Sequence, residues 1–286
     1  MWVADKWSDY ELIDCSDGER LERWGDHLLV RPDPTVIWSA PREHPGWREH
    51  AARYERSPAG GGRWRRRNLP DNWKISYGDL KFNIRPTNFK HTGLFPEQAS
   101  NWDYLTRAIR NAGRPVSVLN MFAYTGAATV AAAAAGASVC HVDAARGMVA
   151  WARENARDSR VGDRPVRWIV DDCAGFLKRE IRRGHRYDAL MMDPPSYGRG
   201  PSGERWKLED DLFGLAGICA DVLCDAPLFV MISSYTAGLS PAVLSYIVGR
   251  VFTERFGGRS GADELGLPVT DSGLVLPCGA TCRWSN

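Results

Sequence analysis

From about residue 111 onward the chain alternates between short apolar segments typical of strands and longer segments typical of helices. The predicted strands cover residues 116–119, 138–142, 167–170, 189–192 and 228–232, and the predicted helices cover residues 126–135, 146–157, 176–183, 212–223 and 241–252. Strands that alternate with helices in this way form a mostly parallel sheet covered on both faces. The pattern therefore predicts an α/β fold for this part of the chain.

The two ends of the chain have a different character. Short runs at residues 28–30 and 35–38 are typical of strands, and most of the tryptophans lie in the first hundred residues. Near the other end, residues 266–270 and 273–277 predict a hairpin. We predict a small β-rich domain over residues 1–88 and a second domain over residues 89–286.

A basic stretch lies inside the β-rich part. Residues 57–68 combine a run of glycines with four arginines around Trp64. Such a loop can lie on a phosphate backbone while Trp64 stacks on a base, which would make this domain an RNA contact. The alternative interpretation is a solvated hairpin tip whose tryptophan packs on its own domain.

The composition is that of a soluble globular protein. Of the 286 residues, 44% are hydrophobic and 25% are charged, which is enough apolar material for a sizeable core. The formal net charge is only +2, so a nucleic acid would have to be held by a local basic patch.

Cysteine usage and the apolar runs indicate the compartment. The seven cysteines form no Cys-x-x-Cys pair, which is typical of reduced intracellular thiols rather than of a disulfide framework. The first residues lack the apolar core of a signal peptide, and the longest apolar run, residues 127–135, is too short to span a bilayer. We expect a cytoplasmic protein without a membrane partner.

Acidic residues follow several predicted strands. Asp143 follows the second strand, Asp171 and Asp172 follow the third, and Asp193 follows the fourth. The prolines after Asp193 cannot continue a strand, so this carboxylate is delivered to the carboxyl end, where open α/β sheets bind their ligands. Any one of these acids can be an ordinary helix cap, but together with the turn at Gly126 they favour an adenosine ligand.

The turn after the first strand distinguishes between adenosine cofactors. Nicotinamide cofactors normally use Gly-x-Gly-x-x-Gly, which packs closely on a pyrophosphate, whereas this turn has only Gly126 followed by two alanines. S-adenosylmethionine has no phosphates and does not need that packing.

Residues 119–126, 141–143, 171–172 and 193–197 resemble the motifs of class I S-adenosylmethionine-dependent methyltransferases. More narrowly, they resemble the branch related to bacterial large-subunit ribosomal RNA methyltransferases, which has an element like residues 89–98 before its catalytic domain. The resemblance covers residues 89–235. It implies a Rossmann-like sheet with helices on both faces, completed by the C-terminal hairpin as an antiparallel pair.

The resemblance also implies roles for individual residues. Asp143 would hold the ribose hydroxyls, Asp172 or alternatively Asp171 the adenine amine, and Asp193 would lie near the methionine ammonium and the reacting methyl group. Two further sets are implied, one that lines the methionine and ribose and one that closes over the cofactor. They are Phe122, Tyr124, Thr125 and Gly126 for the first, and Thr92, Gly93, Phe95 and Gln98 for the second. Gln98 can equally be a helix-start residue without a ligand.

The chemistry of methyl transfer narrows the acceptor. Transfer from a sulfonium needs alignment and exclusion of water, and it requires no metal. Relatives that methylate a pyrimidine carbon place a cysteine nucleophile after the fifth strand, where this chain has residues 232–236 without a cysteine. A base nitrogen is therefore the preferred acceptor.

The segment after the fourth strand supplies the candidate catalytic residues. Asp193 and the Pro194 carbonyl can align an amine while Tyr197 stacks on the ring, although the intervening Ser196 departs from the family pattern and Tyr197 can instead be a packing residue. Residues 198–206 form a glycine-rich loop with two arginines, suited to moving over a substrate. His91 and His141 are interpreted as structural residues.

We therefore predict an S-adenosylmethionine-dependent methyltransferase that acts on RNA, with ribosomal RNA as the preferred substrate. Two alternatives stay open. One is a small-molecule methyltransferase, which the near-neutral charge favours. The other is a non-catalytic protein that binds the cofactor and RNA.

Overall fold

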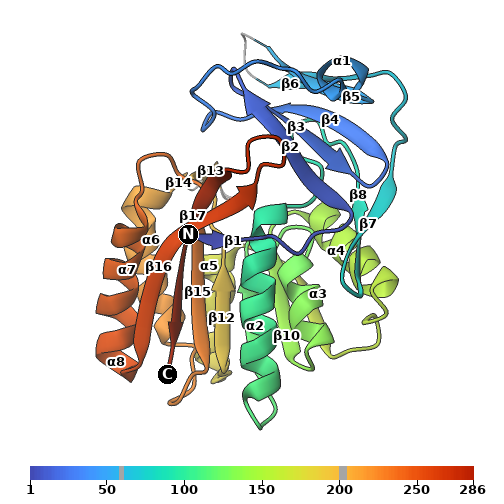
Figure 1. Cartoon of the computed structure of the whole chain (residues 1–286). Coiled ribbons are helices and arrows are strands. Elements are labelled where there is room, and N and C mark those ends of the chain that lie inside the picture. Colours follow the sequence, from blue (N-terminus) through green and yellow to red (C-terminus); the bar gives the residue numbers. More distant parts are fainter. Residues whose placement is uncertain (58–60, 200–204) are drawn as a thin grey trace. The chain divides into compact units, whose positions relative to one another are not determined.

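The structure is a computed structural model that describes residues 1–57, 61–199 and 205–286, with the main chain only at Arg199. The chain divides into two compact units (Figure 1). The first comprises Met1–Ser100 and Gly266–Cys278, and the second comprises Asn101–Leu265 and Gly279–Asn286. The folding domains expected over residues 1–88 and 89–286 stay a prediction.

The largest sheet has the order β1-β16-β17-β15-β12-β9-β10-β11, where β1 is Trp2–Val3, and its parallel strands belong to the second unit. The bounds are β9 Ser117–Met121, β10 Ser138–Asp143, β11 Val166–Val170, β12 Ala189–Met192, β15 Phe229–Ser234, β16 Arg259–Pro268 and β17 Val275–Ser285. Strands β9, β10, β11, β12 and β15 pair in parallel, whereas β17 is antiparallel to β15. This confirms the predicted α/β sheet and its antiparallel completion by the C-terminal hairpin.

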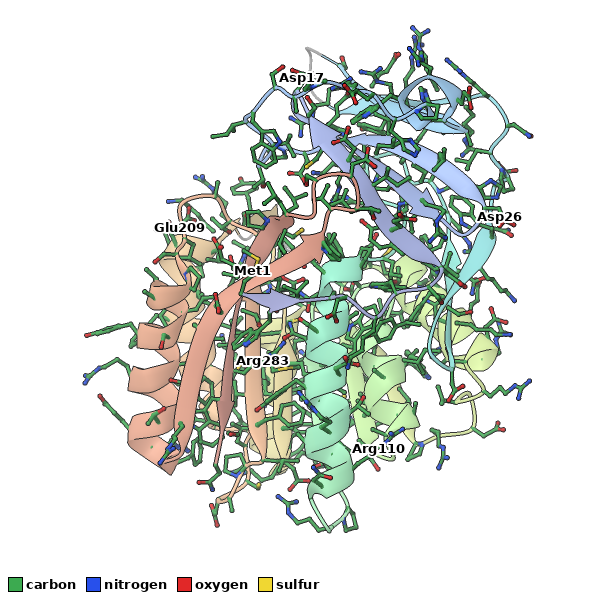
Figure 2. All side chains as sticks on the ribbon, viewed as in Figure 1. Met1, Asp17, Asp26, Arg110, Glu209 and Arg283 are labelled. Carbon is green, nitrogen blue, oxygen red and sulfur yellow. The ribbon has the colours of Figure 1, made fainter. Side chains whose placement is uncertain are left out.

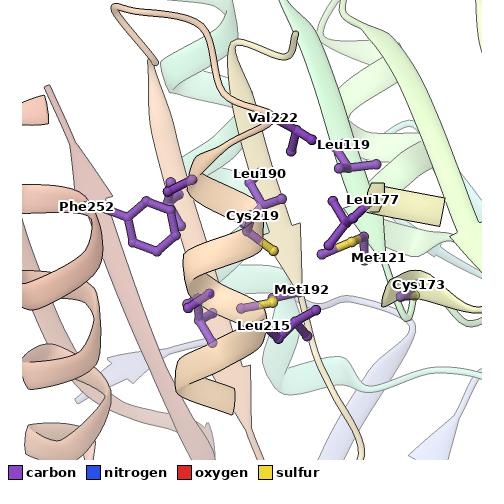
Figure 3. Packing of buried hydrophobic residues seen from close by; sticks show 14 of the residues in the cluster. Leu119, Met121, Cys173, Leu177, Leu190, Met192, Leu215, Cys219, Val222 and Phe252 are labelled. Atoms are coloured by element: carbon purple, nitrogen blue, oxygen red, sulfur yellow. The ribbon is translucent and has the colours of Figure 1, made fainter. Parts of the chain in front are cut away.

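Helices cover both faces of this sheet. Successive strand residues point to opposite sides, so the apolar residues of both sides are buried under helices. On one face, Met121, Val142 and Met192 pack with residues of α5 and α6 in one apolar cluster (Figure 3). On the other face, Asn120 and the buried ring of His141 meet Thr129 of α3. The helices are α2 Ala99–Asn111, α3 Ala127–Ala134, α4 Arg146–Asp158, α5 Cys173–Arg183, α6 Leu208–Ala220 and α7 Pro241–Val248, the last continued by a π-helical turn Gly249–Thr253 and by α8 Glu254–Phe256.

Two local predictions were wrong. Residues 35–38 form no strand, because the Asp33 carboxylate accepts the Thr35 N–H at 2.9 Å and turns the chain. Helix α6 begins at Leu208 rather than at residue 212. Its first turn is acidic, and the Asp211 carboxylate accepts the Lys207 N–H at 2.8 Å, which suits a helix N-terminus.

The first unit contains a five-stranded sheet in the order β2-β3-β4-β5-β6 and a separate hairpin of β7 and β8. The bounds are β1 Trp2–Val3, β2 Tyr10–Ser16, β3 Glu19–Trp24, β4 His27–Pro32, α1 Gly46–Glu49, β5 Ala52–Arg56, β6 Gly62–Arg66, β7 Trp73–Tyr77, β8 Leu80–Ile84 and the 3-10 helix Pro96–Gln98. Asp17 and Gly18 join β2 to β3 with φ of 51° and 74°, as a two-residue turn between twisted strands requires (Figure 2).

A buried ion-pair cluster lies on one face of the five-stranded sheet. Glu22 of β3 is fully buried and accepts hydrogen bonds from Arg31 at 2.5 and 2.7 Å and from the Tyr10 hydroxyl at 2.8 Å. Arg20 lies 3.4 Å from the same carboxylate. Burial alone would raise the pKa of Glu22, but the two arginines and the hydrogen bonds lower it to about 2.

The described helices include none that is long and apolar enough to cross a membrane.

Removing the charge of Glu22 tests how much this cluster stabilises the first unit. Glu22→Gln leaves Arg20 and Arg31 buried without a counter-charge, so the free energy of unfolding should fall by about 3–5 kcal/mol. Because the folded pKa of Glu22 is depressed, its stabilisation is present above its ordinary pKa of 4.5 and is lost as the pH falls toward 2. Urea unfolding of the parent protein should show this acid loss, and the variant should lack that part of it.

The matched control is Glu11→Gln, which breaks the half-exposed ion pair with Arg23 at 3.0 Å. Exposed pairs contribute at most about 1 kcal/mol. Equal losses in the two variants would show that burial does not strengthen the Glu22 cluster.

Candidate functional site

The candidate site lies where the strand order of the sheet reverses. Strand β9 pairs with β10 on one side and with β12 on the other, so loops leaving β9 and β12 diverge at the carboxyl edge. The register pairs Met121 of β9 with Met192 of β12. Phe122 and Asp193, which directly follow these two strands, therefore begin the two loops at the same level of the sheet. Such a switch point is where open α/β sheets bind ligands.

The loop after β9 holds a strained backbone. Phe122 and Tyr124 have φ of 52° and 51°, and Gly126 has φ of 78°. Residues with side chains rarely adopt positive φ, and such strain of about 1–3 kcal/mol each persists where the surroundings enforce it, often at functional sites. Residues 122–126 therefore adopt a strained conformation that the contacts around them must maintain.

Asp143 is one of the groups that fixes this loop. Its carboxylate accepts the Tyr124 N–H and the Ala145 N–H, both at 2.8 Å. Burial raises the pKa of Asp143, and these two backbone hydrogen bonds oppose the rise. Each carboxylate oxygen has a second lone pair, so the side chain can still accept hydroxyl donors.

Helix α4 fixes the other end of the loop. The buried Asn155 donates from Nδ2 to the Thr125 carbonyl at 2.8 Å. A Cβ on Gly126 would lie 2.7 Å from the Cβ of Ala152, so only glycine allows both this φ and this approach of the helix. Sequence reasoning missed Asn155, whose one signal is a polar residue on the apolar face of a predicted helix.

The two acidic residues after β11 interact with helix α5, which follows them in the chain. Asp172 caps α5, since its carboxylate accepts the Gly175 N–H at 2.6 Å, and Asp171 forms an ion pair with Arg179. The Asp171 N–H donates to the Asp143 carbonyl at 3.1 Å, which brings the two strand ends together. Of the pair, Asp172 has the helix-capping role that the sequence left open.

The segment after β12 is anchored at Ser196, the residue that departs from the family pattern. Its hydroxyl accepts from Thr236 Oγ1 at 2.7 Å, and its carbonyl accepts the Leu208 N–H at 3.0 Å. The serine therefore ties the segment to the end of β15 and to the start of α6. Asp193 is half-buried, Pro194 is buried, and Tyr197 is 50% exposed.

The predicted mobile loop is in part a hairpin. Strand β13, Tyr197–Arg199, pairs antiparallel with β14, Arg205–Lys207, while residues 200–204 lie outside the described chain. Trp206 of β14 donates from its indole to the Pro195 carbonyl at 2.5 Å, and its ring lies 5.8 Å from that of Phe122. Trp206 thus joins both loops of the switch point, a role that its place in a glycine-rich run did not indicate.

Four predicted site residues belong to the first unit. Thr92 is fully buried, and its hydroxyl has no hydrogen-bond partner within the part of the chain that the structure describes. Gly93 has φ of 94°, the ring of Phe95 lies 5.6 Å from that of His91, and Gln98 ends the 3-10 helix before α2. The cofactor contact expected of these four residues stays a prediction.

The remaining titratable candidates are structural. His141 is fully buried, its Nδ1 lies 3.0 Å from Thr129 Oγ1, and burial lowers its pKa to about 3. Cys219 is fully buried in the core of the second unit. Over residues 1–57, 61–199 and 205–286, no group of three or more His, Cys, Asp or Glu side chains is placed to hold a metal ion.

Alanine substitutions at two glycines test the close approach of α4 to the loop. Gly126→Ala adds strain at positive φ and a contact with Ala152, so it should lower the free energy of unfolding by about 2–4 kcal/mol. Gly136→Ala, at the other end of α3, also has positive φ, at 105°, but would meet nothing within 4 Å. Urea unfolding should give the control a loss of only about 1–2 kcal/mol. Equal losses would argue against a steric role for Gly126.

Comparisons with known proteins agree on one family. A family model described as S-adenosylmethionine-dependent methyltransferase matches residues 35–206, which is more than half of the chain. A crystal structure of the SAM-dependent methyltransferase from Agrobacterium tumefaciens is 36% identical, with a TM-score of 0.93, and the match covers 99% of this chain and 92% of that one. A methyltransferase structure from Streptococcus mutans, 19% identical with a TM-score of 0.76 over 99% and 76% of the two chains, shares the fold.

Curated relatives match over about half of the chain. Ribosomal RNA large subunit methyltransferase K/L of Chromohalobacter salexigens is 32% identical over 128 residues, which is 44% of this chain and 16% of the relative. The protein of the same name from Shewanella sp. strain MR-4 is 31% identical over 153 residues, or 51% and 20% of the two. The match thus spans a fifth or less of these relatives' length. From the switch-point site and the family model together, we conclude that this chain belongs to the S-adenosylmethionine-dependent methyltransferase family.

Proposed function

We propose that this protein transfers the methyl group of S-adenosylmethionine to ribosomal RNA, at a nitrogen of a base. The observation that carries the proposal is the register of β9 and β12, which starts the Phe122 loop and the Asp193 segment at the same level of the sheet. One loop would hold the donor and the other would present the acceptor. A ribosomal RNA substrate also places the protein in the cytoplasm.

The first support is that the residues present fit the cofactor. Asp143 combines a partly desolvated carboxylate with a fixed position, because two backbone N–H groups hold it. A carboxylate in that place is suited to two ribose hydroxyls, as in other adenosine-binding sheets. The residues we assign to the methionine and ribose are Phe122, Tyr124, Thr125 and Gly126, with Asp171 or Asp172 toward the adenine.

The chemistry asks little of the protein beyond alignment. S-adenosylmethionine supplies an electrophilic methyl group on a sulfonium, which needs no metal or base of its own. The Asp193 carboxylate would accept a hydrogen bond from the acceptor N–H and take up the proton that this nitrogen releases on methylation, and the Pro194 carbonyl would orient the same amine. Trp206 keeps these two loops joined and helps to exclude water.

The choice of nitrogen rests on the residues at the end of β15. This end carries Ser233, Ser234 and Thr236 but no cysteine, and carbon methylation of a pyrimidine needs a cysteine nucleophile. Tyr197, four residues after Asp193, is half exposed, so its ring can stack on a base. The RNA substrate itself is supported by the names of the relatives from Chromohalobacter and Shewanella.

Replacing Asp143 tests the cofactor site. Asp143→Ala should weaken S-adenosylmethionine binding by more than tenfold, because charge-assisted hydrogen bonds contribute about 1.5–3 kcal/mol. Asp143→Asn keeps one acceptor oxygen and should lose less. Isothermal titration calorimetry measures both, with Asp221→Ala as the control, since that carboxylate pairs with Arg255 on the surface at 2.6 Å. An Asp143→Ala affinity equal to that of the control would remove Asp143 from the site.

Mass spectrometry of nucleosides tests the substrate. Ribosomal RNA from cells lacking this protein should lose one N-methylated nucleoside, and purified protein with S-adenosylmethionine should restore it on that RNA. Asp193→Ala should fail to restore the modification even when S-adenosylmethionine is saturating, because its carboxylate is assigned to the acceptor amine as well as to the methionine end of the cofactor. The near-neutral charge favours a small-molecule methyltransferase as the second candidate, and an unchanged nucleoside profile with methyl transfer to a small-molecule fraction would establish it.

A further inference from the structure

The first unit presents one aromatic ring on a rigid loop tip. After β8 the chain forms a narrow loop over residues 85–92, closed by hydrogen bonds from Arg85 N–H to the Thr92 carbonyl at 3.0 Å and from Thr87 N–H to the His91 carbonyl at 3.1 Å. The Thr87 hydroxyl also accepts the Phe89 N–H at 3.2 Å. At the tip, the side chain of Phe89 is 62% exposed.

Trp64 holds this tip from the neighbouring sheet. Its indole N–H donates to the carbonyls of Thr87 and Phe89, both at 3.0 Å, and its ring packs edge-on against Tyr54 at 5.5 Å. The tryptophan that the sequence offered as a base-stacking residue is therefore packed on its own unit. The two hydrogen bonds of its indole fix the backbone of the loop at Phe89.

Two of the four arginines around Trp64 have a counter-charge within their own unit. Arg65 pairs with Glu55 at 2.7 Å, Arg66 pairs with Asp71 at 2.5 Å, and Arg67 donates to the Arg48 carbonyl at 2.5 Å. Arg65 and Arg66 therefore have their charges balanced within the unit, and Arg67 is held by a backbone carbonyl.

Lys90 and Arg56 belong to the two segments that meet near Phe89. Lys90 is half-buried and donates from Nζ to the Pro32 carbonyl at 3.3 Å. Burial and the nearby charge of Arg20 lower its pKa to about 8, with smaller contributions from Arg31 and Arg56, while Asp33 opposes the shift. Arg56 is exposed and lies two residues after Tyr54 on β5, so both side chains leave the same face of the strand. The Tyr54 hydroxyl donates to the Asn88 carbonyl, next to Phe89, at 3.4 Å.

We propose that Phe89, Lys90 and Arg56 form a contact surface for single-stranded RNA, with the ring stacked on a base and the two cations on the backbone. Single exposed apolar side chains are common, so it is the combination with fixed geometry and positive charge that points to a nucleic acid. A protein partner would not need cations beside the ring. This inference rests on the proposed RNA substrate and names where the chain grips it outside the methyl-transfer site.

The test measures binding of a fluorescein-labelled single-stranded RNA of about 12 nucleotides, by anisotropy, with S-adenosylmethionine affinity measured in parallel. Phe89→Ala should weaken RNA binding about tenfold, Phe89→Trp should restore it, and neither should change cofactor affinity. Arg56→Gln should lower the slope of log affinity against log salt by about one.

The matched control is Ile37→Ala, which removes a side chain that is 90% exposed in the same unit, on the turn formed with Asp33. It should leave RNA binding unchanged. Equal RNA affinity for Phe89→Ala and Ile37→Ala, with tight binding by the parent protein, would overturn this contact surface and leave the proposed function standing. No RNA binding by the parent protein would overturn both.

Discussion

The site depends on one hydrogen bond, which the Asp143 carboxylate accepts from the backbone N–H of Tyr124. A loop with two side-chain-bearing residues at positive φ would relax in isolation, since each such residue costs about 1–2 kcal/mol. The carboxylate at one end and Asn155 at the other keep it in place. The same carboxylate is the group assigned to the ribose, so cofactor binding and loop geometry share one residue.

The contacts of Ser196, the extra residue after the two prolines, hold the segment after β12 in place. Ser196 is bonded to Thr236 and to the first residue of α6, and Trp206 bonds Pro195 while contacting Phe122. The two loops of the switch point are thus held by different contacts that meet at one indole. A methyl transfer that relies on alignment benefits from such a rigid frame.

The sequence predicted the parts that depend on local patterns. Apolar runs ending in prolines or acids gave β12 with its observed bounds, and the position of Asp143 followed from the end of β10. Contacts between distant residues were beyond reach, because nothing local relates Asn155 to Thr125 or Trp206 to Phe122. Segment 35–38 was misread because a hydrogen bond to the Asp33 side chain overrode the apolar pattern, whereas Trp64 packs on its own unit as the alternative interpretation had it.

The central claim is that the carboxyl edge of β9 and β10 holds the adenosine of the cofactor. A crystal structure of the protein with S-adenosylhomocysteine tests it most directly. Both ribose hydroxyls should lie within about 2.5–3.2 Å of the Asp143 carboxylate, and the sulfur should be directed toward Asp193. A bound ligand whose ribose does not contact Asp143, or whose sulfur is directed away from the Asp193 segment, would contradict it.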